Sequence, residues 1–139
     1  MNIDSISNGI VIDHIKADNG MKLYDLLNLG NLNCSVAIIK NVNSKKMGKK
    51  DIIKIDANIP IDLNVIGFVD PDVTVNIIHD GKVVEKKDIG MPEKLVNVIK
   101  CKNPRCITST EQELVHIFKL ADAETKTYRC IYCETKANI

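Results

Sequence analysis

The sequence predicts an α+β fold, and three observations support this prediction. Short β-branched runs alternate with two helical segments over the first two thirds of the chain. Two of these runs are separated by Asp80-Gly81, a pair that supplies the positive φ angles of a tight β-hairpin turn. The last third contains four cysteines in two close pairs. We therefore expect a helix-backed sheet followed by a small metal-organised β domain.

The first predicted elements are a strand and a helix. Residues 9–15 are β-branched and short, as is typical of a strand. In the next segment leucines recur at helical spacing, and Asp18 or Asn19 can cap the helix. Gly30 follows the last of these leucines and indicates a left-handed helix stop.

Two further strands are predicted in the middle of the chain, at residues 35–40 and 50–56. The polar residues 41–48 between them predict a loop. Lys50 and Lys54 are an even number of residues apart, so we expect both side chains on the same face of their strand.

A second helix and a hairpin complete the predicted sheet. Pro60 and Asp62 are typical of a helix start, and the hairpin strands follow at residues 73–78 and 82–86. The order strand, helix, strand, strand, helix, strand, strand favours a ferredoxin-like antiparallel sheet with two helices on one face. The other face would be open for a ligand or a partner.

Gly90-Met91-Pro92 interrupts this pattern and predicts the domain boundary. We expect one domain over residues 1–92 and a second over residues 93–139. The second would be a small zinc-ribbon-like β domain, because the cysteine cluster begins soon after the boundary.

Composition excludes several classes of protein. The 139 residues are 45% hydrophobic, enough to bury one ordinary core or two small ones. Lys plus Arg (19) nearly balance Asp plus Glu (18), so the broad positive field of a general nucleic-acid binder is missing. The sequence has no spanning apolar run, and residues 1–5 do not have the character of a signal peptide. We expect a cytoplasmic protein that binds neither membranes nor nucleic acid.

Cys101, Cys106, Cys130 and Cys133 are the predicted ligands of one structural zinc ion per chain. Four thiolates close the tetrahedral coordination and leave no open position for catalysis. His116 has no partner at ligand spacing, so we interpret it as an ordinary strand histidine. We found no Ser-His-Asp, paired-carboxylate or Cys-His arrangement with usable spacing, and we expect the chain to catalyse nothing on its own.

The ordered set of motifs resembles the regulatory chain of aspartate carbamoyltransferase, an enzyme of pyrimidine biosynthesis. The motifs are Gly-Ile-Val-Ile-Asp-His-Ile in the first strand, residues 47–55, residues 74–76, residues 95–99 and the cysteine spacing. The resemblance implies a non-catalytic allosteric subunit whose first domain binds a nucleoside triphosphate, ATP, CTP or UTP. It also implies pairing with a second regulatory chain, and an assembly of two catalytic trimers with three regulatory dimers.

The resemblance implies specific contact residues as well. Those matched to the effector site are Val11, Asp13, His14, Lys50, Lys54, Asn76 and Lys86. Those matched to the contact with the catalytic chain are Asn103, Arg105 and Glu134. The chemistry of the lysines agrees, because three ammonium groups can bind a triphosphate without a Gly-rich loop.

Two other functions remain open on the residues alone. Four cysteines in two pairs are also typical of a zinc-ribbon nucleic-acid-binding protein. The ferredoxin-like domain by itself is compatible with a stand-alone small-molecule sensor. Lysines on a strand are, moreover, often just a solvated face.

Overall fold

The computed structural model describes residues 6–111 and 113–137, and the chain divides into two compact units, residues 1–90 and 91–139. Residues 1–5, on which the expectation about a signal peptide rests, lie outside the described residues. No helix in the described ranges has both the length and the apolar character needed to span a membrane.

The first unit is built on a five-stranded sheet in the order β2-β3-β1-β4-β5, with every neighbouring pair antiparallel. Its strands are β1 (Gly9–Lys16), β2 (Val36–Ser44), β3 (Gly48–Ile55), β4 (Thr74–His79) and β5 (Lys82–Asp88). The first four strands have the order of a ferredoxin-like sheet, and β5 extends it through the predicted Asp80-Gly81 hairpin. The predicted α+β class is confirmed.

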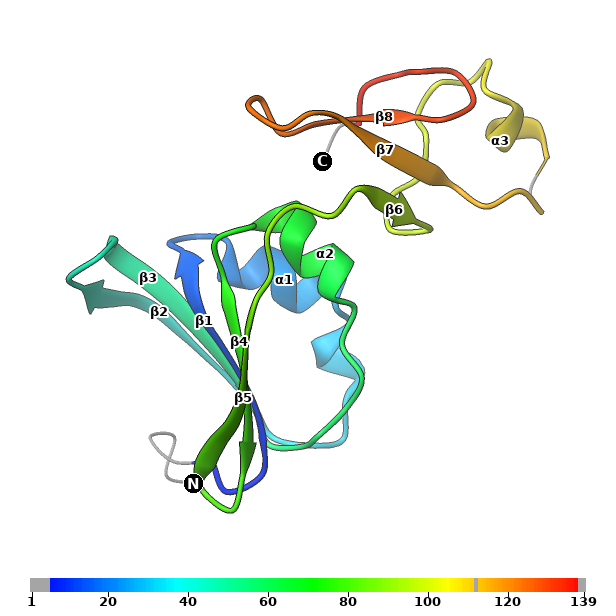
Figure 1. The fold of residues 1–139 in the computed structure, drawn as a ribbon. Coiled ribbons are helices and arrows are strands. Elements are labelled where there is room, and N and C mark those ends of the chain that lie inside the picture. Colours follow the sequence, from blue (N-terminus) through cyan, green and yellow to red (C-terminus); the bar gives the residue numbers. More distant parts are fainter. Residues whose placement is uncertain (1–5, 112, 138–139) are drawn as a thin grey trace. The chain divides into compact units, whose positions relative to one another are not determined.

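The two helices, α1 (Gly20–Leu26) and α2 (Leu63–Val69), cover the same face of this sheet (Figure 1). A short 3-10 helix, η1 (Leu29–Asn31), follows α1. Their apolar side chains pack on alternate residues of β1, β3 and β4. The buried core consists of Ile10, Ile12, Ile15, Leu23, Leu29, Ile53, Ile55, Ile66, Val73 and Val75.

The helix starts differ in how they are capped. Asp62 caps α2 as expected, because its side chain accepts hydrogen bonds from the backbone N–H groups of Asn64 and Val65. Neither candidate cap of α1 is used in this way: Asn19 makes no side-chain cap hydrogen bond. The backbone N–H of Gly20 instead donates to the carboxylate of Asp51, at 3.1 Å.

Asp51 is a completely buried carboxylate on β3. Its Oδ2 accepts from the N–H groups of Asp18 and Gly20, both at 3.1 Å, and its Oδ1 accepts from the N–H of Asn41 at 3.0 Å. A side chain at Gly20 would meet the same carboxylate, since an added Cβ would lie 2.8 Å from Oδ2. One side chain thus ties the start of α1 and an irregular point of β2 to the centre of the sheet.

The predicted end of the first helix at Gly30 is wrong. The helix ends at Leu26, and Asn28 takes the left-handed conformation with φ of 55°. Asparagine tolerates this conformation because its short polar side chain carries little steric cost. Gly30 has a different role: an added Cβ there would lie 2.9 Å from the hydroxyl of Tyr24.

The predicted loop at residues 41–48 is mostly strand. β2 continues to Ser44, where it pairs with Gly48, so only residues 45–47 form the turn. A register shift follows Ile39, and Asn41 has φ of 58°. The polar residues misled the prediction because this end of the hairpin is solvated on both faces, where strand formation does not require apolar alternation.

The second unit is a three-stranded antiparallel sheet in the order β6-β7-β8. Its elements are β6 (Lys94–Val96), the four-residue helix α3 (Ile107–Thr110), β7 (Ile117–Asp122) and β8 (Thr127–Cys130). Leu95, Phe118 and Tyr128 are buried, and the Tyr128 hydroxyl donates to the carbonyl of Pro92 at 2.7 Å. Three large side chains are a small core for an independent unit, so a further source of stability is required.

Candidate functional site

Four of the predicted effector residues form one cross-strand row. Lys54 on β3 pairs with Val11 on β1, Val11 pairs with Asn76 on β4, and Asn76 pairs with Lys86 on β5. Their neighbours Ile53, Ile12 and Val75 face the helices, so the row lies on the opposite face by alternation. Three strand spacings of about 4.8 Å place the two lysines about 14 Å apart at their backbones. The row therefore has a lysine at each end, with one apolar and one amide side chain between the two lysines.

Asp13 and Lys50 lie on the same face and form an ion pair, with Nζ 2.9 Å from Oδ1. The two side chains are 23% and 16% exposed, so the pair is partly shielded from water. Burial alone would raise the pKa of Asp13, but hydrogen bonds from Lys50 and from the backbone N–H of His14 outweigh it and lower the pKa. Lys50 is thus already held by an anion within its own sheet.

His14 lies beside this pair at a bulge of β1. Its φ is 60°, and the pairing with β3 shifts register between Ile12 and Ile15. The bulge lets Ile12 and Ile15 both point into the core although they are three residues apart. Nδ1 of His14 is buried without a hydrogen-bond partner among the described residues.

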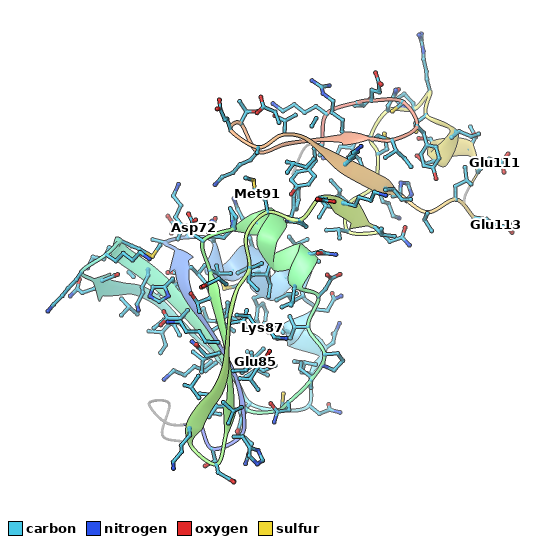
Figure 2. All side chains as sticks on the ribbon, in the orientation of Figure 1. Asp72, Glu85, Lys87, Met91, Glu111 and Glu113 are labelled. Carbon is cyan, nitrogen blue, oxygen red and sulfur yellow. The ribbon has the colours of Figure 1, made fainter. Side chains whose placement is uncertain are left out.

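The outer strand β5 carries charges on both of its faces. Lys86 is exposed and lies in the cross-strand row. Glu85 and Lys87, labelled in Figure 2, alternate with it and form an exposed pair with 3.6 Å between Oε1 and Nζ. Alternation therefore separates Lys86 from the acidic residue next to it in sequence.

The second unit brings the four predicted zinc ligands together. Cys101 lies in the loop after β6, and Cys106 is the N-cap residue of α3. Cys130 ends β8, and Cys133 lies in the turn that follows. Their four Sγ atoms all lie within 4.8 Å of one another.

The spacing of the sulfur atoms fits a tetrahedral metal ion. The Sγ atoms of Cys101 and Cys133 are 3.5 Å apart, and those of Cys106 and Cys130 are 3.7 Å apart. Zn–S bonds of about 2.3 Å in a tetrahedron require S···S distances of about 3.8 Å. A disulfide requires about 2.05 Å, so these are four free sulfurs gathered around one point.

The thiols differ in acidity because their surroundings differ. Burial raises the pKa of Cys101 to about 12 and also raises the pKa of Cys130. A hydrogen bond with the Thr135 side chain lowers the pKa of Cys133 to about 6. Burying several like charges so close together is costly, and a divalent cation removes that cost. The donor set therefore suits a soft, thiolate-preferring metal.

His116 is not a strand histidine, which corrects the expectation from the sequence. It precedes β7, and its Nδ1 accepts a hydrogen bond from the backbone N–H of Cys101 at 3.3 Å. The backbone N–H of His116 donates to Oδ1 of Asn97 at 2.9 Å. His116 thus supports the first ligand loop without being a ligand itself. Nothing in the sequence indicates this role, which depends on contacts made only in the fold.

The three predicted partner-contact residues surround the metal cluster. Arg105 and Glu134 are exposed, whereas the half-buried Asn103 uses both ends of its amide within the unit. Asn103 lines a hollow of ≈ 270 Å³ together with Lys102. Glu134 lines another hollow of ≈ 480 Å³, next to Ile131.

Comparison with known proteins gives the same division of the chain. Residues 1–90 match the family model of the aspartate carbamoyltransferase regulatory chain, allosteric domain, and residues 93–139 match that of its metal binding domain. A regulatory chain from Clostridium tetani is 53% identical over 135 residues, which are 96% of this chain and 94% of that protein. One from Clostridium acetobutylicum is 51% identical over 134 residues, 96% and 92% of the two chains. One from Bifidobacterium longum is 43% identical over 139 residues, the full length of both.

These matches, together with the sheet and the cysteine cluster, favour this assignment over a zinc-ribbon nucleic-acid binder. They also give the chain a place in pyrimidine biosynthesis. The chain belongs to the family of aspartate carbamoyltransferase regulatory chains, the non-catalytic subunits of that enzyme.

Proposed function

We propose that this chain binds a nucleoside triphosphate on the open face of its first sheet and transmits the effect to the catalytic chain of aspartate carbamoyltransferase. The observation that carries the proposal is the cross-strand row of Lys54, Val11, Asn76 and Lys86. The lysines offer charge-assisted hydrogen bonds to phosphate oxygens, Asn76 offers an amide, and Val11 offers an apolar surface. Residues 1–92 form the effector and dimer domain of this proposal, and residues 93–139 form the zinc domain.

In the proposed site, Asp13, His14 and Lys50 border the same ligand. Lys50 exchanges its ion pair with Asp13 for a phosphate or sugar oxygen, so binding begins by breaking a contact of 2.9 Å. An effector that is bound and not hydrolysed needs neither magnesium ligands nor a general base. The ligands under this proposal are ATP, CTP and UTP.

The test of the effector site is calorimetric titration of the zinc-loaded full chain with each nucleotide. Replacing Lys54 or Lys86 with Ala removes one charge-assisted contact and should weaken binding about tenfold. Lys22→Ala is the matched control, since Lys22 is an exposed lysine on α1 and thus belongs to the helix side of the sheet. Equal losses in the control and the row variants would refute a site on the open face.

The second unit, in this proposal, binds one zinc ion through its four cysteines and docks on the catalytic chain. Asn103, Arg105 and Glu134 border the docking surface, and the hollow beside Glu134 can receive a partner side chain. The zinc is structural: four thiolates saturate it, and its binding energy stabilises a unit with a small apolar core.

The whole assembly in this proposal contains two catalytic trimers and three regulatory dimers, in the cytoplasm. Triphosphate charge drawn to Lys50, Lys54 and Lys86 alters how two regulatory chains pair. The change passes the domain boundary at Met91, the first residue of the second unit (Figure 2). Carbamoyltransferase activity of the reconstituted complex against aspartate concentration, with and without each nucleotide, tests this coupling. Curves that coincide under all conditions would refute it.

A further inference from the structure

The sulfur atoms of the metal cluster do not have equivalent surroundings, and two of them meet threonine hydroxyls. The Oγ1 of Thr108 donates a hydrogen bond to Cys106 Sγ at 3.1 Å. Thr108 is only 4% exposed, so its hydroxyl has little access to water. The next threonine of α3 differs, because the exposed Thr110 donates to the backbone carbonyl of Ile107. The hydroxyl of Thr108 is thus directed to a metal ligand rather than to the helix backbone.

Thr135 lies against Cys133: as a thiol, Cys133 Sγ donates to Thr135 Oγ1 at 3.2 Å. Asn103 fixes its direction: Nδ2 of Asn103 donates to Thr135 Oγ1 at 3.2 Å. The amide orientation is itself determined, since the backbone N–H of Arg105 must meet the oxygen end, Oδ1, at 3.0 Å. A metal-bound thiolate has no proton, so the hydroxyl proton of Thr135 is the one that lies between oxygen and sulfur.

The two hydroxyls are distributed evenly over the cluster. The Thr108 hydroxyl contacts Cys106, a cysteine of the first pair, and the Thr135 hydroxyl contacts Cys133, a cysteine of the second pair. Four thiolates around one divalent ion carry two excess negative charges, and each donor disperses part of one of them. Outer hydrogen bonds of this kind orient metal ligands and tune the bound metal.

We propose that Thr108 and Thr135 are positioning residues of the metal site, which donate hydrogen bonds to two of the metal-bound thiolates and thereby set how tightly the metal is held. The inference rests on the zinc site proposed above and adds the groups that regulate its affinity. Asn103 acts through Thr135, so its amide contributes to the metal site as well as to the proposed docking surface.

The experiment uses the full chain loaded with Zn²⁺ or with Co²⁺ as a spectroscopic probe. Thr108→Val and Thr135→Val remove the hydroxyl and keep the shape, whereas Thr108→Ser and Thr135→Ser keep the hydroxyl. Thr110→Val is the matched control in the same helix. Chelator competition should show zinc binding about 10- to 100-fold weaker in each Val variant. The Ser variants and the control should stay close to the original chain.

The cobalt spectrum separates hydrogen bonding from packing. A hydrogen bond lowers the energy of the sulfur electrons, so removing it should move the sulfur-to-cobalt charge-transfer band to lower energy. The band position is independent of how much protein is loaded, so it reports on a variant that folds poorly.

Two results would overturn the inference: an unmoved band with unchanged zinc affinity in both Val variants, or Ser variants as impaired as the Val variants. An original chain that takes up no metal would instead overturn the zinc site itself, and this inference with it.

Discussion

Asp51 supports a prediction whose size can be worked out from the structure. Its buried carboxylate accepts three backbone hydrogen bonds, from Asp18, Gly20 and Asn41. Hydrogen bonds to a charged group each contribute about 1.5–3 kcal/mol, so three would sum to about 4.5–9 kcal/mol. The expected loss is smaller than this sum for two reasons. Water that enters the space left by the side chain can accept from some of the three N–H groups, and the contributions of neighbouring hydrogen bonds are not additive. We expect Asp51→Ala to lower the free energy of unfolding by about 3–5 kcal/mol.

Asp51→Asn should cost less, about 2 kcal/mol, because its amide oxygen can still meet the two donors at one end. Its NH₂ group then faces the N–H of Asn41, so two donors oppose each other. For a unit of this size, the loss of about 2 kcal/mol in Asp51→Asn corresponds to a fall in melting temperature of about 10 °C. The matched control is Asp56→Asn, since Asp56 is an exposed acid directly after the same strand.

The assay is urea unfolding of the zinc-loaded chain, followed by far-ultraviolet circular dichroism and by the NMR signals of the Tyr24 ring, which are distinct from those of Tyr128 and Tyr132 in the second unit. Tyr24 lies on α1 and reports on the first unit, whereas zinc release reports on the second. The Asp51 variants should lose Tyr24 structure at lower urea and release zinc as before. An Asp51→Ala protein whose free energy of unfolding lies within about 1 kcal/mol of the original would refute the reasoning. A loss that small is typical of an average substitution and would leave no role for three buried hydrogen bonds.

Three further predictions concern single groups. Asp62→Ala should destabilise the first unit by about 1 kcal/mol through loss of the helix cap, measured by the same urea titration. Asp13→Asn should lower the free energy of unfolding at neutral pH but not in acid. The pKa of Asp13 is lowered in the folded chain, so its ion pair with Lys50 stabilises the fold above the unfolded pKa of about 3.9, and this contribution is lost as the pH falls below that value. Urea unfolding at pH 7 and at pH 3 checks this. Zinc affinity should rise by at least about 100-fold per pH unit near neutrality. The raised pKa values of Cys101 and Cys130 mean that both must release a proton on binding, and each proton contributes a factor of about ten. Chelator competition at pH 6.5 and 7.5 measures this, and equal affinities at the two pH values would contradict it.

Local signals were sufficient for most of the fold. The Asp80-Gly81 turn has positive φ at both residues, and Asp62 caps α2 as its position predicted. The cysteine spacing predicted a cluster that the structure brings within 4.8 Å. Each of these features is decided by a few neighbouring residues, or by a ligand set whose geometry is fixed by chemistry.

The missed features depend on contacts between distant parts of the chain. Asp51 follows a lysine in a strand, and nothing nearby marks it as the buried acceptor for Asp18 and Asn41. Thr108 and Thr135 are ordinary threonines in the sequence, and only the folded loops bring them to sulfur. Hydrogen-bond partners of this kind cannot be predicted from periodicity, because periodicity gives the face of a residue and not its contacts.

The two units obtain their stability from different sources, and this difference decides how variants should be interpreted. Among its described residues, the first has ten buried apolar side chains in one core and a fully buried carboxylate that joins its elements. The second has a small core and four cysteines whose thiolate forms can lie this close together only around a cation. A substitution in the first unit that changes zinc affinity, or one in the second that changes nucleotide affinity, therefore cannot be explained by local loss of stability. Under the proposed function, such an effect would measure coupling between the two sites. By linkage, a partner of the second unit must then change nucleotide affinity by the same factor by which the nucleotide changes binding of that partner.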